Sequence, residues 1–335
     1  MKAWEIRGGF GLENLVRTER PDPEPGTGEV LVEVKATSLN FRDWMMLKGE
    51  YNPRQPLPLV PLSDGAGVVR GVGPKVRRFK VGDRVTAIFA QRWMGGEVTR
   101  DSIRSSMGGP LDGMLSQYRA LSEEGLVATP AHLSDEEAAT LPCAAVTAWS
   151  AFAQRPLKPG ETVLVQGTGG VALFALQFAK LAGARVLLIS SSDAKLERAQ
   201  RLGADAVLNY RTTPEWGQWA REETGGEGVH HVVEVGGAGT LKQSLRAVRI
   251  NGQVSVIGVL GGSATETSLI PILMQNVRLQ GVVVGSREDF EAMARARTLH
   301  GLHPVLDRTF DFEDVPAAFA HLASGAHFGK VCIRI

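Results

Sequence analysis

The chain has 335 residues, more than a single small hydrophobic core usually holds, so two domains are expected. Its 37 Lys and Arg residues nearly balance its 36 Asp and Glu residues, which excludes a strong overall field for gathering nucleic acid or anionic membranes. A small-molecule partner is therefore favoured. The two cysteines, Cys143 and Cys332, are too few for a disulfide framework or a structural metal cluster.

The amino-terminal segment MKAWEIRGGF has no apolar run behind a basic start. No later stretch reaches the roughly 18 uninterrupted apolar residues that a membrane span needs. We therefore expect neither secretion nor membrane insertion, and a cytoplasmic location.

The first third of the chain is predicted to be rich in β-structure. The segment EVLVEVK at 29–35 alternates apolar and polar residues, and GAGVVRGVG and DRVTAIFA follow between Gly, Pro and Asp residues. Near Ser134 the pattern changes, because SDEEAATLPCAAVTAWSAFAQ has a Ser cap, acids in its first turn and then the residues of a buried helix. The sequence thus predicts a first domain over 1–123 and a second domain that begins at 124, just before this helix.

From Glu161 onward, short apolar segments alternate with amphipathic ones, starting with TVLVQ, VALFALQFAKLAG and RVLLIS. This alternation is typical of βαβ units, whose parallel strands are buried on both faces and therefore continuously apolar. We expect a doubly wound parallel sheet of about six strands over 124–286. The chain then becomes helical and ends in KVCIRI, a strand without a βαβ partner, so residues 287–335 are expected to complete the first domain.

The strongest chemical signal is a glycine-rich turn after the first of these strands. In TVLVQGTGGVALFALQFAK, Gly167, Gly169 and Ala172 have the spacing of a dinucleotide-binding turn. Gly167 permits the tight turn, Gly169 lets the backbone approach a pyrophosphate, and Ala172 allows close helix–strand packing. A glycine cluster alone could be merely a loop, but its place in the βαβ series favours a cofactor site. The residues expected to contact the cofactor here are Gly167, Thr168, Gly169, Gly170, Val171 and Ala172.

The end of the second strand of this series favours NADP(H) over NAD(H). NAD sites usually have an acid there, roughly 20 residues beyond the motif, to bind the ribose 2′-hydroxyl. Here the position holds Ser190, and Ser190, Ser191 and the cation Lys195 can bind a 2′-phosphate by hydrogen bonds and charge. The alternative is that residues 191–193 only cap the next helix and that Lys195 is a solvated surface residue. The two interpretations are compatible.

Taken in order, these segments resemble the medium-chain dehydrogenase/reductase superfamily over essentially the whole chain. The matching stretches are PGTGEVLVEVKATSLNFRD, LPLVPLSDGAGVV, VGDRV, LPCAAVTAW, GTGGVALFALQFAK, LGADAVLNYR and GKVCIRI. The resemblance implies an α/β protein with a GroES-like β-rich catalytic domain, completed by the carboxyl-terminal segment, and a Rossmann doubly wound cofactor domain.

Zinc-dependent members of that superfamily bind a catalytic zinc at positions that here hold Asn40, Ser63, Asp64 and Cys143. One soft ligand without an imidazole cannot make the usual open three-ligand site, so we expect no catalytic zinc. The lobe that carries four clustered cysteines in many zinc alcohol dehydrogenases corresponds to 91–112, which contains none, so no structural zinc is expected either. Cys143 is expected to be a small residue lining the cleft and not a nucleophile.

The zinc-free quinone oxidoreductases are the branch that the chain resembles most, because SLNFRD is similar to their N-x-x-D element. The resemblance implies that Asn40 lies near the nicotinamide and the substrate. The pair Ser63–Asp64 departs from close quinone reductases, which leaves the substrate open. The resemblance implies further cofactor contacts at Thr147, Lys195, Tyr210, Gly258, Val259, Val283, Gly285 and Lys330.

Without a metal, reducing a simple ketone is hard, because the charge on its oxygen must be stabilised by other groups. Conjugate reduction of a quinone or an α,β-unsaturated carbonyl by NADPH is easier, since the hydride goes to carbon and the charge spreads to an oxygen. We expect Asn40 and Tyr51 to donate hydrogen bonds to that oxygen and Ser63 or water to relay the proton. Asp43 is expected to orient its neighbours. For Tyr51 the alternative is a surface aromatic in the loop GEYNPRQP.

Two other functions stay open: a metal-dependent alcohol dehydrogenase with displaced ligands, since the chain has seven His residues, and a NADPH-binding protein with little catalysis. His230 and His231 are adjacent on a predicted strand and point to opposite faces, which makes them a poor metal pair. No basic stripe interleaved with aromatics favours RNA. The apolar segment Gln280–Val284 is predicted to be an edge strand that pairs with its copy in a second subunit, giving a homodimer.

Overall fold

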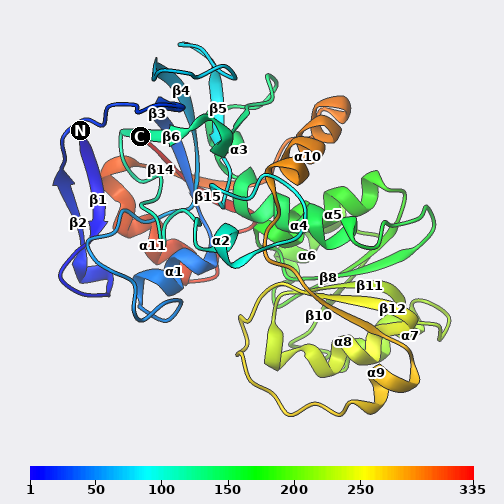
Figure 1. Cartoon of the computed structure of the whole chain (residues 1–335). Coiled ribbons are helices and arrows are strands. Elements are labelled where there is room, and N and C mark those ends of the chain that lie inside the picture. The colour runs from blue at the N-terminus through cyan, green and yellow to red at the C-terminus, as the bar shows by residue number, and fades with distance from the viewer. The chain divides into compact units, whose positions relative to one another are not determined.

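The structure, a computed structural model, describes residues 1–335 and contains two compact units (Figure 1). The first unit comprises Met1–Val146 and Val284–Ile335, and the second comprises Thr147–Val283. The first division falls at 146/147, later than the expected 123/124, because β7 and α3 belong to the first unit: β7 pairs with β5, and α3 packs on β3 and β4. None of the helices combines the length and the apolar composition needed to cross a membrane.

The first unit is built on a seven-stranded sheet and a separate two-stranded one. The order β14-β15-β3-β4-β5-β7, with β6 also paired to β3, confirms that the carboxyl-terminal strand returns to the first unit. The strands are β1 (Lys2–Ile6), β2 (Leu15–Glu19), β3 (Glu29–Leu39), β4 (Asp64–Val72), β5 (Arg84–Ala87), β6 (Tyr118–Ser122), β7 (Leu126–Ala128), β14 (Leu306–Asp311) and β15 (Lys330–Arg334). The helices are α1 (Phe41–Leu47), α2 (Arg100–Ile103), α3 (Asp135–Ala139), α10 (Arg287–His300) and α11 (Val315–Ala323).

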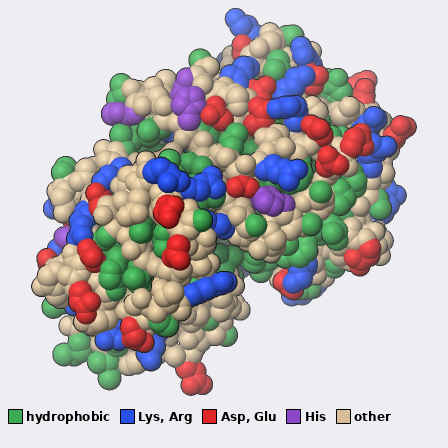
Figure 2. All heavy atoms as spheres, turned by 180° about the vertical axis from the view of Figure 1, so that it is seen from behind, with side chains coloured by type: hydrophobic (Ala, Val, Ile, Leu, Met, Phe, Trp, Pro, Cys, Tyr) green, Lys and Arg blue, Asp and Glu red, His purple; other side chains and the backbone are tan.

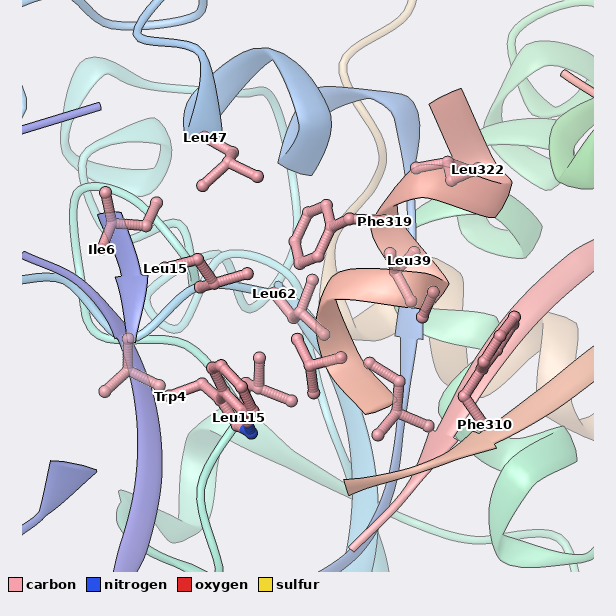
Figure 3. Close-up of a cluster of buried hydrophobic side chains, with 14 of the residues drawn as sticks. Trp4, Ile6, Leu15, Leu39, Leu47, Leu62, Leu115, Phe310, Phe319 and Leu322 are labelled. Atoms are coloured by element: carbon pink, nitrogen blue, oxygen red, sulfur yellow. The ribbon is translucent and has the colours of Figure 1, made fainter. Parts of the chain in front are cut away.

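A hydrophobic core in the first unit holds the chain on both sides of Asn40. Figure 3 shows Leu39, at the end of β3, and Leu47, at the end of α1, among the side chains of this core, with Phe319 of α11 close to them. Leu39 and Leu47 are buried, and the burial of each side chain stabilises the fold by about 1.5–3 kcal/mol relative to leaving it exposed. Asn40 and the first turns of α1 are therefore anchored at both ends.

The second unit is built on one parallel sheet of six strands, which confirms the predicted doubly wound architecture. The strands are β8 (Thr162–Gln166), β9 (Arg185–Ser190), β10 (Ala206–Asn209), β11 (Val229–Glu234), β12 (Val248–Val256) and β13 (Arg278–Gly281). The helices are α4 (Val146–Ala153), α5 (Gly170–Leu181), α6 (Asp193–Arg201), α7 (Trp216–Glu222), α8 (Leu241–Ala247) and α9 (Ile270–Met274). The order β10-β9-β8-β11-β12-β13 reverses direction between β8 and β11, and ligands of such sheets bind at the carboxyl ends of the strands on either side of this reversal.

The single buried helix predicted after Ser134 is broken into three pieces. The first, α3, ends at Ala139, a π-helical segment covers Leu141–Ala145, and α4 starts at Val146. Pro142 explains the break, since proline has no N–H for a helical hydrogen bond and its ring clashes with the preceding turn. The division between the two units lies one residue after the π-helical segment, between Val146 and Thr147.

Candidate active site

The turn between β8 and α5 in the second unit has the backbone geometry of an anion site. Gly167 has a φ of 78° and open space where a Cβ would be, and its N–H donates to the carbonyl of Ile189 at 2.7 Å. Gly169 is the N-cap of α5, and no side chain caps the helix. The first N–H groups of this 12-residue helix are thus left without a capping side chain, as a bound pyrophosphate requires. The turn fits a dinucleotide.

The carboxyl ends of β9 and β10 bring two of the expected cofactor residues together. Ser190 is the register partner of Asn209, and the N–H of Tyr210 donates to the carbonyl of Ser190 at 3.0 Å. Lys195 lies in the first turn of α6. Ser192 is the N-cap of α6 but makes no capping hydrogen bond with its side chain. Capping of α6 alone therefore does not explain the three consecutive serines at 190–192.

One carboxylate and one further cation lie at the same corner. Asp193 accepts a hydrogen bond from the Asn209 amide at 2.8 Å. Arg211 follows Tyr210 and is exposed. Arg211 was not considered in the sequence analysis, although it directly follows an expected cofactor contact.

A buried carboxylate organises the loop after β11, where the sheet reverses direction. Glu234 is fully buried and accepts hydrogen bonds from the N–H groups of Gly236 at 2.8 Å and Gly237 at 2.9 Å, and from the Gln166 amide at 2.8 Å. The hydroxyls of Thr240 and Ser244 also donate to it. This network was not predicted from the sequence, although an acid and an amide at the ends of the apolar segments VHHVVE and TVLVQ were visible signals.

The same loop lies against the expected contacts Gly258 and Val259. A Cβ on Gly258 would come within 2.6 Å of the Val235 carbonyl oxygen, so only glycine fits there. The other expected contacts lie at the ends of the unit: Thr147 is its first residue and is buried, and Val283 is its last. Gly285 belongs to the first unit.

In the first unit, Asn40 is bonded to a buried lysine. The Lys330 ammonium donates to Asn40 Oδ1 at 2.6 Å and to the carbonyl of Leu39 at 2.7 Å, and lies 3.6 Å from Asp64 Oδ2. The three side chains meet because β15 and β4 pair with β3 on either side of it. Lys330 is also expected to contact the cofactor, and that contact stays a prediction; in the structure its ammonium belongs to this cluster.

Asp64 is also held by two serines. Ser63 Oγ donates to Asp64 Oδ1 at 2.8 Å, and Ser38 Oγ donates to Asp64 Oδ2 at 3.0 Å. Ser63 and Asp64 are fully buried. The hydroxyl proton of Ser63, which is expected to take part in a relay, therefore points at the Asp64 carboxylate.

Arg42 connects Asp43 and Tyr51. Its guanidinium lies 4.9 Å from the ring centre of Tyr51 and 4.9 Å from that of Phe89, and it donates to two backbone carbonyls at 3.0 Å. Tyr51 is half-exposed, yet its ring is positioned by this contact. Asp43 Oδ2 accepts the Asn40 N–H at 2.8 Å. Burial raises the pKa of Asp43 to about 6, although the charge of Arg42 opposes this shift.

The donor set of this cluster does not fit a zinc ion. A cation, the Lys330 ammonium, lies between Asn40 and Asp64, two of the positions that correspond to zinc-site residues. Burial raises the pKa of the Cys143 thiol, and a metal ligand must be a thiolate. His231 pairs with Ser255 and His230 with the Thr162 N–H, so the two imidazoles serve different partners. No three His, Cys, Asp or Glu side chains are grouped to hold a metal.

Two protein families match the chain. Residues 26–131 match the alcohol dehydrogenase GroES-like domain, and residues 170–298 match the zinc-binding dehydrogenase family. A zinc-type alcohol dehydrogenase-like protein of Schizosaccharomyces pombe is 43% identical over 97% of this chain and 96% of its own length. An acryloyl-coenzyme A reductase of Metallosphaera sedula is 29% identical over 94% of this chain and 95% of its own length.

Solved structures match over the full chain. An NAD-dependent alcohol dehydrogenase has a TM-score of 0.92 and 33% identity, with 100% of both chains covered. A mycobacterial protein complexed with NADPH has a TM-score of 0.84 and 26% identity, again with 100% of both chains covered.

Proposed function

The chain belongs to the medium-chain dehydrogenase/reductase superfamily, and from this premise we propose that it is a zinc-independent, NADPH-dependent reductase of quinones or α,β-unsaturated carbonyl compounds. The observation that carries the proposal is the amide nitrogen of Asn40, which is buried and has no protein partner, while the amide oxygen bonds Lys330. Such a donor suits an oxygen on which charge develops.

NADPH, when bound at the glycine turn, supplies a hydride for a substrate carbon. The residues of this chain bind the substrate oxygen and relay the proton. Asn40 Nδ2 donates to the substrate oxygen, and Tyr51, held by Arg42, is the second donor. The proton that completes the reduction comes from solvent, relayed to the substrate by a water molecule or through the Ser63 hydroxyl, which takes up a proton as it passes one on. The acryloyl-coenzyme A reductase relative supports this chemistry, since acryloyl-coenzyme A is an α,β-unsaturated thioester.

The proposal is tested by assaying the purified chain with quinones, enones, enoyl thioesters and aldehydes, each with NADPH and NADH, together with metal analysis. We expect turnover of a quinone or an enone with NADPH in protein that holds no stoichiometric zinc. One zinc per chain, with turnover of alcohols or aldehydes alone, would establish the alcohol dehydrogenase function instead. Cofactor binding without turnover of any compound would show a binding protein.

The Lys195→Ala variant is expected to raise the KM for NADPH about 10- to 100-fold, the loss expected for one charge-assisted hydrogen bond, while the KM for NADH stays unchanged. Arg201→Ala, at the other end of α6, is the matched control and should leave both values unchanged. Steady-state kinetics with each cofactor measures the effect. Equal changes for NADPH and NADH would refute a 2′-phosphate contact.

We also propose that the protein is a homodimer through the edge of the second unit. The expected edge strand over Gln280–Val284 is in fact the short β13, Arg278–Gly281, and the chain leaves the sheet after it. The apolar surface belongs to α9, which directly precedes β13: its N-cap Leu269 and its residues Ile270, Leu273 and Met274 are exposed by 74%, 67%, 77% and 73%. Figure 2 shows apolar side chains gathered at the lower left, the part of the second unit that carries α9. An open strand edge next to an apolar helix suits a two-fold contact with a second copy.

We expect light scattering at micromolar concentration to give the mass of a dimer for the wild type and of a monomer for Leu273→Asp, because the charge would be buried in the contact. Leu299→Asp, on an equally exposed leucine of α10, is the control and should stay dimeric. A monomeric wild type would refute the dimer, and a dimeric Leu273→Asp would refute this face.

A further inference from the structure

We propose that Lys330 is a positioning residue, which holds the Asn40 amide so that its N–H groups stay available to the substrate oxygen. The inference rests on the proposed function and adds to it a residue that does not itself contact the substrate. It starts from the bond of 2.6 Å between the Lys330 ammonium and Asn40 Oδ1.

The chemistry of the two groups allows one orientation of the amide. An ammonium carries three donors and no acceptor, whereas an amide has an acceptor oxygen and a donor nitrogen. Lys330 can therefore bond Oδ1 alone. Rotating the Asn40 amide by half a turn would bring Nδ2 against the ammonium, donor against donor, and would lose the bond.

The ammonium itself has little freedom, because three strands hold it. It is the side chain of the first residue of β15, it bonds the carbonyl of Leu39 on β3 at 2.7 Å, and it faces Asp64 on β4 at 3.6 Å. Lys330 is 3% exposed and Asp64 is fully buried. Leu39, in turn, belongs to the hydrophobic core. The direction of the amide is thus set by the sheet.

The nitrogen of the Asn40 amide is the atom that the proposed function places against the substrate oxygen. Asn40 Nδ2 is buried and has no protein partner, which is unfavourable unless a ligand supplies an acceptor. The adjacent positive charge polarises the amide and strengthens its N–H donors, as in other hydrogen-bond chains in a low dielectric. Lys330 thereby brings a positive charge to this site without contacting the substrate.

A purely structural role, neutralising Asp64, explains the distances less well. The Lys330 ammonium is nearer to Asn40 Oδ1, at 2.6 Å, than to Asp64 Oδ2, at 3.6 Å. Both carboxylate oxygens of Asp64 already accept serine hydroxyls. If Lys330 served only to neutralise Asp64, its removal would lower the stability of the fold. Any effect on kcat would then be the same whether Asn40 is present or not.

A double-mutant cycle tests the proposal. The wild type, Lys330→Met, Asn40→Ala and the double variant are assayed with a quinone or an enone and NADPH. We expect Lys330→Met to lower kcat about 10- to 100-fold with little change in KM, but to lower it less than about twofold in the Asn40→Ala background, because the group through which it acts is gone. Lys330→Arg, which also only donates, should restore part of kcat.

A second measurement does not depend on turnover. In protein labelled with 15N at asparagine, the side-chain amide signal of Asn40, assigned by its loss in Asn40→Ala, should shift or broaden in Lys330→Met and remain sharp in Lys330→Arg. If Lys330→Met does not fold, Lys330→Gln replaces it. Glutamine offers both a donor and an acceptor, so it should also release the amide.

The proposal is overturned if Lys330→Met keeps the wild-type kcat, if its loss is the same in the Asn40→Ala background, or if the Asn40 amide signal is unchanged. Each of these results leaves the proposed function standing, provided that Asn40→Ala itself is impaired. Wild-type turnover by Asn40→Ala would instead overturn the role given to Asn40 in the proposed function, and this inference with it.

Discussion

Replacing Asn40 by alanine is expected to lower kcat/KM for a quinone or enone about 100- to 1,000-fold, the loss seen when one oxyanion donor is removed from an enzyme. The loss should fall mainly on kcat, because the bond from Asn40 Nδ2 strengthens as charge develops on the substrate oxygen. Alanine keeps the backbone N–H that bonds Asp43 but removes the N-cap side chain of α1, which costs about 0.5–2 kcal/mol, so the fold should be retained at a somewhat lower stability.

Variants of two other residues in this region, Tyr51 and Asn52, are compared with Asn40→Ala. Tyr51→Phe removes one hydroxyl from a half-exposed ring and is expected to cost about tenfold, because water can replace part of its contribution. Asn52→Ala removes an amide that donates to Gln55 and accepts the Arg54 N–H, and should leave turnover unchanged. Steady-state kinetics on the three variants decides the matter: wild-type turnover by both Asn40→Ala and Tyr51→Phe would show that the oxyanion assignment is wrong.

His231 is expected to make the second unit lose stability in acid. Its imidazole is fully buried between Phe152 and Ser255, and burial lowers its pKa to about 3. Between pH 6.5 and about 3 the unfolded chain binds a proton at this residue that the folded chain does not, so the free energy of unfolding falls as the pH falls. At pH 5 this amounts to about 2 kcal/mol relative to pH 7.5.

Asp43 has the opposite effect on the first unit. Burial raises its pKa from 3.8 to about 6, so in this range the folded chain holds the proton more tightly than the unfolded chain. The contribution of Asp43 to the free energy of unfolding therefore rises as the pH falls from about 6 to 3.8. This contribution is lost again as the pH rises through about 6. The two groups offset each other in the intact protein, and they are separated only by changing one at a time.

The measurement is urea unfolding at pH 7.5 and pH 5.0 of the wild type, His231→Leu and Asp43→Asn. His231→Leu should lose less stability on acidification than the wild type, by about 2 kcal/mol, and Asp43→Asn should lose more. His300→Leu, on an exposed imidazole at the end of α10 in the first unit, is the control for His231 and should follow the wild type more closely. Equal acid sensitivity of the wild type and His231→Leu would contradict the burial of a neutral imidazole.

The architecture of the second unit could be predicted because its signals are local. Continuously apolar strands such as TVLVQ, separated by amphipathic helices, specify a parallel sheet wherever they occur. The helix after Ser134 was predicted wrongly, since its composition is helical throughout and Pro142 was given too little weight against that pattern. The unit boundary was missed for a related reason: only the pairing of β7 with β5, a tertiary contact, assigns β7 to the first unit.

The site could be predicted in part. Asn40 and the glycine turn belong to short motifs, and both could be found without coordinates. The partner of Asn40 could not, because Lys330 is 290 residues away and its side chain arrives through sheet pairing. The Glu234–Gln166 bond joins residues 68 apart on adjacent strands, for the same reason. Motifs identify the groups that act, whereas the groups that hold them come from the topology.

The pairing of β15 with β3 also has a consequence for biosynthesis. Ala36–Leu39 bonds Val331–Arg334, so this stretch of β3 keeps an open hydrogen-bonding edge while the ribosome makes almost three hundred further residues. Nascent domains generally fold in order from the amino terminus, but here the unit that is translated first cannot finish before the one inserted within it. Pauses or truncations late in translation would therefore leave a folded nucleotide-binding unit attached to an incomplete, aggregation-prone partner.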